Sequence, residues 1–204
     1  MQARRLAAHD LACRRGDRVL FRGLHFALQA GEALHLAGPN GVGKSSLIRI
    51  LAGLLRPFAG SVTREGALAL ADERPALDAH LALGAALGFW RTFDRADAAT
   101  LDAAIATLGL GDLLDVPVRY LSTGQRKRAA LARTLLAGAP VWLLDEPLNG
   151  LDTATTATVE TLVAAHIAAG GIAVIASHQP FALGGMARLE LTAFEPAPFE
   201  PAGA

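Results

Sequence analysis

Residues 33–46 read ALHLAGPNGVGKSS, a mostly apolar run followed by a loop rich in glycine. The run at 33–37 predicts a buried strand, and the loop at 38–45 matches the pattern GxxxxGK[ST] between a strand and a helix. In that setting, small residues let backbone N–H groups converge on phosphate oxygens at the start of the helix. An ordinary glycine-rich turn would not need the strand and the helix on either side of it. The segment therefore predicts a phosphate-binding loop.

The two residues that end the loop supply an amine and a hydroxyl group to the predicted phosphate site. Lys44 would meet the β- and γ-phosphates of a nucleoside triphosphate, and Ser45 would be a ligand of Mg²⁺. We therefore expect ATP and Mg²⁺ to bind here. The candidate ATP-contacting residues of this segment are Gly38, Pro39, Asn40, Gly41, Val42, Gly43, Lys44, Ser45 and Ser46.

Short apolar runs alternate with amphipathic helical patterns along the chain. The runs at 141–144 and 172–176 predict further buried strands, and each is followed at once by polar residues. Such alternation is typical of an α/β fold in which helices cover both faces of a parallel sheet. We expect the helix after the phosphate loop to end near Arg56, before Pro57. Its core face would carry Leu47, Ile50, Leu51 and Leu54.

Two carboxylates stand at the end of the predicted strand in VWLLDEP, residues 141–147. Asp145 would hold the Mg²⁺ shell, and Glu146 would orient or deprotonate the attacking water. A solvated strand end with charged residues is the alternative, and without the phosphate loop we would favour it. With the loop present, the pair predicts the catalytic end of an ATPase site.

The segment LSTGQRKR at 121–128 precedes a helical stripe that contains Leu131 and Leu135. Ser122 and Gln125 have the spacing of a capping box, in which each side chain accepts a backbone N–H of the other residue. Taken alone, helix capping explains this segment. A helix start headed by small residues is also a site for anions.

Composition limits the class of protein. The 204 residues carry 19 basic and 19 acidic side chains, so no net positive charge is available to hold nucleic acid, and we expect no nucleic-acid partner. Cys13 is the only cysteine, which excludes an internal disulfide. Residues 161–187 lack charged side chains, but Gly170-Gly171 and the SHQP segment at 177–180 interrupt them. We therefore expect a helix end, a turn and a buried strand rather than a membrane span.

The two ends of the chain predict no secretory signal and a tail without folded structure. Residues 1–11 lack the uninterrupted apolar stretch of a secretory signal, so we expect no export. Residues 195–204 are rich in proline and have little to bury, so they predict a disordered tail. The remaining 1–194 would form a single domain.

The motif Leu-Ser-x-Gly-Gln resembles the signature motif of ATP-binding cassette (ABC) proteins, and it lies in the family's order between the phosphate loop and the Asp-Glu strand end. The resemblance spans residues 20–180. It implies the P-loop NTPase fold of an ABC nucleotide-binding domain, with a small helical subdomain at about 77–133. It also implies that Ser122, Gly124 and Gln125 contact the γ-phosphate of an ATP held by a second copy of the subunit.

Two further segments match the family, and two depart from it. His178 stands where the family's switch histidine does, after the last predicted strand, and would contact the γ-phosphate or the attacking water. Residues 149–152, NGLD, resemble the family's dimer-contact loop, although a helix N-cap at Asp152 explains them equally well. Where the family has a glutamine that faces Mg²⁺, this chain offers Asp72, Glu73 or Arg74. In place of an adenine-stacking aromatic residue it offers Arg15 or Phe21.

Residues 178–180, HQP, and the short middle third with few charges resemble one subfamily, the ATPases of the haem exporter used in cytochrome c maturation. This resemblance implies integral membrane subunits as partners, two ATPase copies, and a peripheral position on the cytoplasmic face of a bacterial inner membrane. The alternatives are an ABC exporter of a different small cargo, a soluble ABC protein acting on ribosomes or nucleic acid, and a phosphate-loop kinase. A kinase would leave the segment at 121–125 without a purpose.

Overall fold

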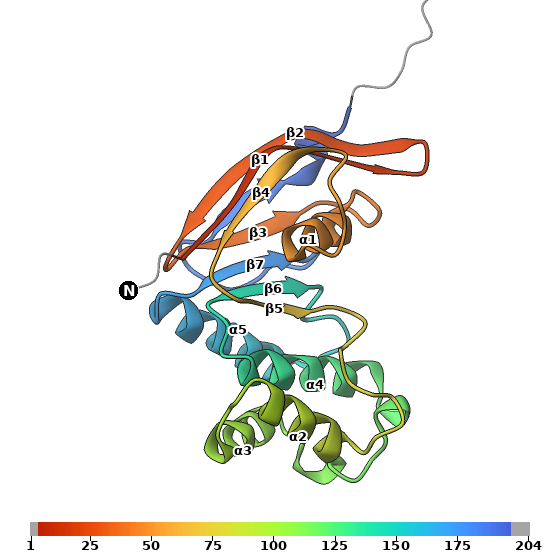
Figure 1. Cartoon of the computed structure of the whole chain (residues 1–204), viewed down its shortest axis with the longest axis vertical. Helices are drawn as coiled ribbons and strands as arrows, with labels where there is room; N and C mark the ends of the chain where they lie inside the picture. The colour runs from red at the N-terminus through yellow and green to blue at the C-terminus, as the bar shows by residue number, and fades with distance from the viewer. Residues whose placement is uncertain (1–3, 197–204) are drawn as a thin grey trace, which may run out of the picture.

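A five-stranded parallel sheet forms the centre of the computed structural model, which describes residues 4–196 (Figure 1). Its strand order is β5-β6-β7-β3-β8, and every neighbouring pair is parallel. The strands predicted at 33–37, 141–144 and 172–176 are confirmed as the three middle ones, with one further residue on β6. The five strands are β3 (Ala33–Ala37), β5 (Leu68–Ala71), β6 (Val141–Asp145), β7 (Ile172–Ala176) and β8 (Ala187–Glu190).

A second, antiparallel sheet packs over one face of the parallel sheet, and the sequence analysis did not predict it. Its order is β2-β1-β4, and the strands are β1 (Arg5–Arg15), β2 (Arg18–Gln29) and β4 (Ala59–Glu65). Helix α1 (Lys44–Ala52) lies between the two sheets (Figure 1). The helix expected on this face is therefore present, and the antiparallel sheet covers it in turn.

The opposite face of the parallel sheet is covered by helices α4 and α5, and α2 and α3 pack on α4 farther from the sheet (Figure 1). Short 3₁₀ helices connect some of these elements. The α-helices are α2 (Leu83–Phe93), α3 (Ala98–Thr107), α4 (Thr123–Leu136) and α5 (Thr153–Ala168). The 3₁₀ helices are η1 (Gly111–Leu113), η2 (Val118–Tyr120) and η3 (Leu191–Phe194).

Glycines end two of the helices, one of them earlier than predicted. Helix α1 stops at Ala52 because Gly53 takes a left-handed conformation with φ 78° and donates its N–H to the Ile50 carbonyl. The predicted end near Arg56 is therefore wrong, and Leu54 is 68% exposed rather than part of the core. At α3, Gly109 follows the end of the helix with φ 58°.

Helix α5 begins at the N-cap that the sequence offered at Asp152. Asp152 caps it by accepting the Thr155 N–H at 2.7 Å, and the chain turns before β7. The helix end, turn and buried strand expected for residues 161–187 are confirmed. Within residues 4–196, no helix combines the length and the apolar character needed to cross a membrane. The disordered tail was predicted at 195–204, and residues 197–204 lie outside the described residues.

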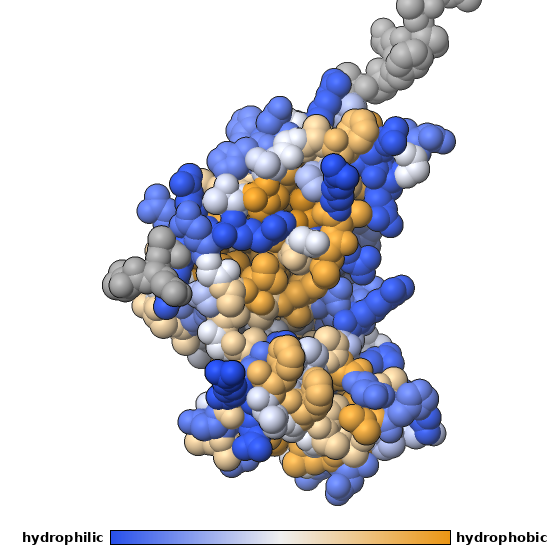
Figure 2. Space-filling view, viewed as in Figure 1, coloured by the Kyte–Doolittle hydropathy of each residue, from blue (hydrophilic) through white to orange (hydrophobic). Residues whose placement is uncertain are grey.

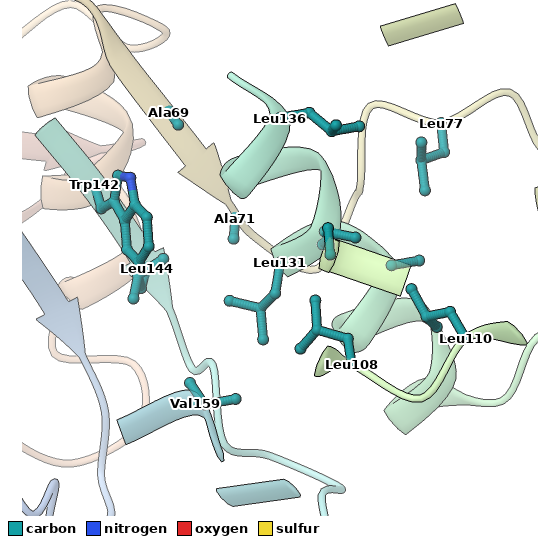
Figure 3. Packing of buried hydrophobic residues seen from close by; sticks show 14 of the residues in the cluster. Ala69, Ala71, Leu77, Leu108, Leu110, Leu131, Leu136, Trp142, Leu144 and Val159 are labelled. Carbon is teal, nitrogen blue, oxygen red and sulfur yellow. The ribbon is translucent and has the colours of Figure 1, made fainter. Parts of the chain in front are cut away.

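Two hydrophobic clusters stabilise these layers, one on each side of the parallel sheet. The first joins α4 to β5, β6 and α5; Figure 3 shows Leu131 of α4 between strand residues such as Leu144 and the side chains of Leu108 and Leu110. The second lies around α1, where Leu47, Ile48, Ile50 and Leu51 are fully buried between the sheets. Because α1 is fixed on both sides, the loop in front of it is held in place.

Candidate functional site

The phosphate loop leaves β3 and turns back to start α1 within six residues. Gly43 makes this turn possible because its φ is 116°, a conformation that residues other than glycine rarely adopt. A Cβ at this position would also meet Leu20 and Phe21 at 3.3 Å. The small residues are therefore required by the backbone path, as well as by access to phosphate.

Lys44 is almost fully buried, and its amine faces the centre of the site. Its Nζ donates to the carbonyl oxygens of Gly38 at 2.8 Å and Pro39 at 3.2 Å, and it lies 3.6 Å from Oε1 of Glu146. These contacts hold a positive charge inside the loop, where triphosphate oxygens would replace the carbonyl and carboxylate partners.

Ser45 and Asp145 form a pair of oxygen ligands suited to a small divalent cation. Oδ1 of Asp145 is buried and has no hydrogen-bond partner among residues 4–196. Burial raises the pKa of Asp145, and the nearby Ser45 hydroxyl opposes this shift. Mg²⁺ is usually bound by one or two carboxylate ligands together with waters and phosphate oxygens, so these residues fit it.

Glu146 is held at the end of β6 by contacts to three different segments. Its N–H donates to the Ala176 carbonyl of β7 at 2.7 Å, and its Oε2 lies 2.8 Å from Nδ1 of His178. Together with the Lys44 contact, these fix the carboxylate between the phosphate loop and the segment after β7. A carboxylate in that position can orient a water molecule and accept its proton.

A hollow of about 350 Å³ opens in front of these groups. The structure thus brings six of the nine predicted loop residues together with Glu146, whereas Gly38, Pro39 and Val42 do not line this hollow. His178 is in contact with Glu146. Ser122, Gly124 and Gln125 do not line this hollow, so within one chain they are not part of it. Its lining residues are Leu20, Asn40, Gly41, Gly43, Lys44, Ser45, Ser46, Glu73, Glu146 and Asn149.

The start of α4 contains the predicted capping box. The Gln125 N–H donates to Oγ of Ser122 at 3.2 Å, and the Ser122 N–H donates to Oε1 of Gln125 at 2.7 Å. A Cβ on Gly124 would meet the Gly150 carbonyl oxygen at 2.5 Å, so this helix start packs directly on the loop before α5. The small residue at 124 is thus required by packing within the chain.

Two departures from the family pattern have a structural outcome. Phe21 is 0% exposed and packs beneath Gly43, so the expectation that it stacks on adenine is wrong. Arg15 is exposed beside the turn between β1 and β2 and keeps its proposed role. Of the three residues offered in place of the glutamine, Glu73 lines the hollow, whereas Asp72 pairs with Arg49 at 3.7 Å.

Sequence reasoning missed Lys127, which is 9% exposed and donates a hydrogen bond from Nζ to the Glu146 carbonyl oxygen. A signal was present, because Lys127 lies four residues before Leu131 and therefore on the buried stripe of the predicted helix. It also missed Gln179, whose Nε2 donates to Oδ1 of Asn149 at 3.4 Å at the edge of the site.

Comparison with known proteins identifies the family of the chain. The family model described as ABC transporter matches residues 21–149. The cytochrome c biogenesis ATP-binding export protein CcmA of Novosphingobium aromaticivorans is 62% identical over 196 residues, which cover 96% of this chain and 100% of that protein. The protein of the same name from Sphingopyxis alaskensis is 53% identical and covers 87% of this chain and 92% of its own length.

A solved structure of an ABC transporter ATP-binding protein from Pyrococcus furiosus superposes with a TM-score of 0.80 at 21% identity, covering 94% of this chain and all of that one. At that identity the likeness concerns the fold alone. The sequence relatives are far closer, and they match along almost the whole chain. The chain therefore belongs to the ABC transporter family of ATP-binding proteins, and within it to the CcmA group.

Proposed function

We propose that this chain is the ATP-hydrolysing subunit of the haem exporter complex used in cytochrome c biogenesis. The observation that carries the proposal is the contact of Glu146 with both Lys44 and His178 in front of the phosphate loop. This is an ATPase arrangement, and it occurs in a chain 62% identical to a cytochrome c biogenesis export protein. Haem as the cargo follows from the group to which the chain belongs.

Each residue has a distinct part in the proposed reaction. The backbone N–H groups of residues 38–46 and the Lys44 amine bind the β- and γ-phosphates. Ser45 and Asp145 would hold Mg²⁺, which supplies charge neutralisation between the phosphates. Glu146 takes the proton of the water that attacks the γ-phosphate, with ADP as the leaving group. His178 orients Glu146 through the 2.8 Å contact and would also contact the γ-phosphate.

A complete site needs two copies of the chain. Ser122, Gly124 and Gln125 lie outside the hollow that holds Lys44, yet the start of α4 is a site for anions. We assign these residues to the γ-phosphate of an ATP bound by the partner copy, in a head-to-tail dimer with two ATP molecules at its interface. The loop at 149–152 would contact the partner beside them.

The membrane subunits would bind on the side of the helical subdomain, which we place at about 77–133 within a single domain at 1–194. Phe89 and Phe93 of α2 are 59% and 67% exposed, and Figure 2 shows hydrophobic residues gathered on this part of the surface. Exposed aromatic groups on one helix face are typical of protein contacts. The chain would thus be peripheral, on the cytoplasmic face of the bacterial inner membrane.

An ABC exporter of a different small cargo has the same ATPase site, so cargo is decided by the following experiment. A bacterial strain that lacks its own CcmA receives this chain, the E146Q variant or the K44A variant, and covalent haem in c-type cytochromes is measured by haem staining of gels. We expect the wild-type chain alone to restore the cytochromes. Equal haem staining with E146Q would contradict the proposal, whereas failure of all three with intact ATPase activity of the purified wild type would indicate another cargo.

A further inference from the structure

Glu146 has an unusual backbone conformation for a residue with a side chain. Its φ is 49°, in the left-handed region that residues other than glycine, asparagine and aspartate seldom occupy. Such a conformation persists only where surrounding contacts enforce it, and it is found most often at functional sites. The contacts that enforce it here decide where the carboxylate points.

The carbonyl oxygen of Glu146 receives two hydrogen bonds. One comes from the N–H of Asn149 at 3.3 Å, and the other comes from the amine of Lys127 on α4. The N–H of Glu146 is held by the Ala176 carbonyl at 2.7 Å. Of these three partners, Lys127 is the only side chain, and it is the only one on an element outside the 145–150 segment and β7.

Lys127 is kept buried at a cost. Its 9% exposure lowers the pKa of its amine by desolvation, and four carboxylates oppose this shift, Glu73 most strongly. Its hydrogen bond within the described residues goes to a main-chain carbonyl rather than to a carboxylate. A hydrocarbon side chain would fill the same space without that cost, so the amine is explained by what it holds.

A second contact joins the same two segments one helical turn earlier. Gly124 packs so closely on the Gly150 carbonyl oxygen that a Cβ would approach it to 2.5 Å. Residues 124 and 127 lie three apart and therefore on one face of α4. The N-terminus of α4 and the segment at 146–150 are thus linked at two points, and a shift of one moves the other.

We propose that Lys127 is a positioning residue for ATP hydrolysis, which holds the main chain of Glu146 in the conformation that directs its carboxylate to Lys44 and His178. Its hydrogen bond also joins the segment of that base to α4. This inference rests on the proposed ATPase function and two-copy arrangement. It adds a residue to which the sequence motifs assign no role.

The test compares full-length K127M, K127Q and K127R with the wild type in ATPase assays and nucleotide binding assays. Methionine keeps the stem and loses the donor, so we expect kcat to fall about 10- to 100-fold, the scale of a displaced catalytic group, with KM for ATP changed less than about twofold. Arginine keeps donors, and K127R should stay within about threefold of wild type. K127Q, whose amide stem is shorter, should fall between them and serves as the test where K127M does not fold.

R128M is the matched control. Arg128 is on the same helix and also donates to main-chain carbonyls, those of Leu108 and Gly109, but these lie away from the site. It should lower thermal stability and leave kcat unchanged. Should R128M and K127M lose kcat to the same degree, Lys127 is merely structural.

A double variant separates action through Glu146 from a general defect. In the E146Q background, K127M should produce no further loss in the residual hydrolysis rate, because the base it positions is already gone. A further loss equal to that in the wild-type background overturns the inference. A wild-type chain without ATPase activity would instead overturn the proposed function, and wild-type kcat in folded K127M overturns the Lys127 role alone.

Discussion

Asp145 shows at the scale of one residue how the site lowers the stability of the chain. Because burial raises its pKa above the ordinary value of 3.8, the folded chain binds a proton that the unfolded chain has already released. Stability therefore decreases as pH rises from about 3.8 through the raised pKa, and the full cost is present above that raised pKa. A cation beside the buried Oδ1 would offset it.

The variant D145N should make this cost visible. Without nucleotide and with a chelator present, we expect its melting temperature at pH 7 to exceed that of the wild type by about 2–4 °C, the change that about 1 kcal/mol produces in a chain of this size. Mg²⁺ with ATP should raise the melting temperature of the wild type and not that of D145N, and D145N should lose hydrolysis. Equal or lower stability of D145N in the absence of metal would contradict this account.

His178 is a second residue whose part can be measured alone. H178A removes the 2.8 Å contact to Glu146, and the carboxylate is then free to turn, so kcat should fall about 10- to 1000-fold while ATP affinity is kept. H80A is the control, because His80 is exposed and contacts Arg119 instead. Single-turnover hydrolysis of bound ATP measures the step directly; an unchanged rate in H178A would remove the histidine from the reaction.

At the scale of elements, the start of α4 has a structural part and a proposed catalytic part that can be separated. S122A removes an N-cap, and D97A removes the N-cap of α3, where Asp97 accepts the Thr100 N–H at 2.7 Å. Each loss should cost about 1 kcal/mol in the free energy of unfolding. Only S122A should also lower ATPase activity, by about tenfold or more. Equal ATPase activity in the two variants would reduce Ser122 to a helix cap.

The elements that the sequence predicted are those with a local signal. The runs at β3, β6 and β7 are wholly buried, so their apolar character is continuous, and the caps of α4 and α5 are set by neighbouring residues. The antiparallel sheet has no such signal. Register shifts after Ala8, including a left-handed Asp10 with φ 50°, break the alternation of β1, so its burial does not follow a period of two.

The candidate site follows the same rule. The phosphate loop and the Asp-Glu pair were predictable because contiguous residues carry the chemistry. Glu73 was one of three candidates that the sequence offered, and the path of the chain after β5 decides among them. Lys127 lies on the buried stripe of the predicted helix, but only the packing of α4 brings its amine to the Glu146 carbonyl oxygen. Phe21 was misassigned because its burial under Gly43 depends on the antiparallel sheet.

At the scale of the whole molecule, each ATPase site is proposed to combine residues from two copies of the chain. If each site combines Lys44 of one copy with Ser122 of the other, then K44A and S122R each abolish both sites of their own homodimer. A mixed dimer keeps one intact site, because the S122R chain supplies Lys44 and the K44A chain supplies Ser122. The exchange of parts between copies therefore predicts activity from two inactive proteins.

Mixing purified K44A and S122R chains in equal amounts should restore ATPase activity to about a quarter of the wild-type value per chain, because half of randomly assembled dimers are mixed and each has one of two sites intact. A rate below that value would mean that the two sites of a dimer require each other. Size-exclusion chromatography with E146Q and Mg·ATP checks that dimers form. Dimers mixed from E146Q and wild-type chains are the control: half the wild-type rate in them shows that one intact site works alone. If that control holds and the K44A–S122R mixture stays inactive although mixed dimers are present, Ser122 does not contact the ATP of the partner copy.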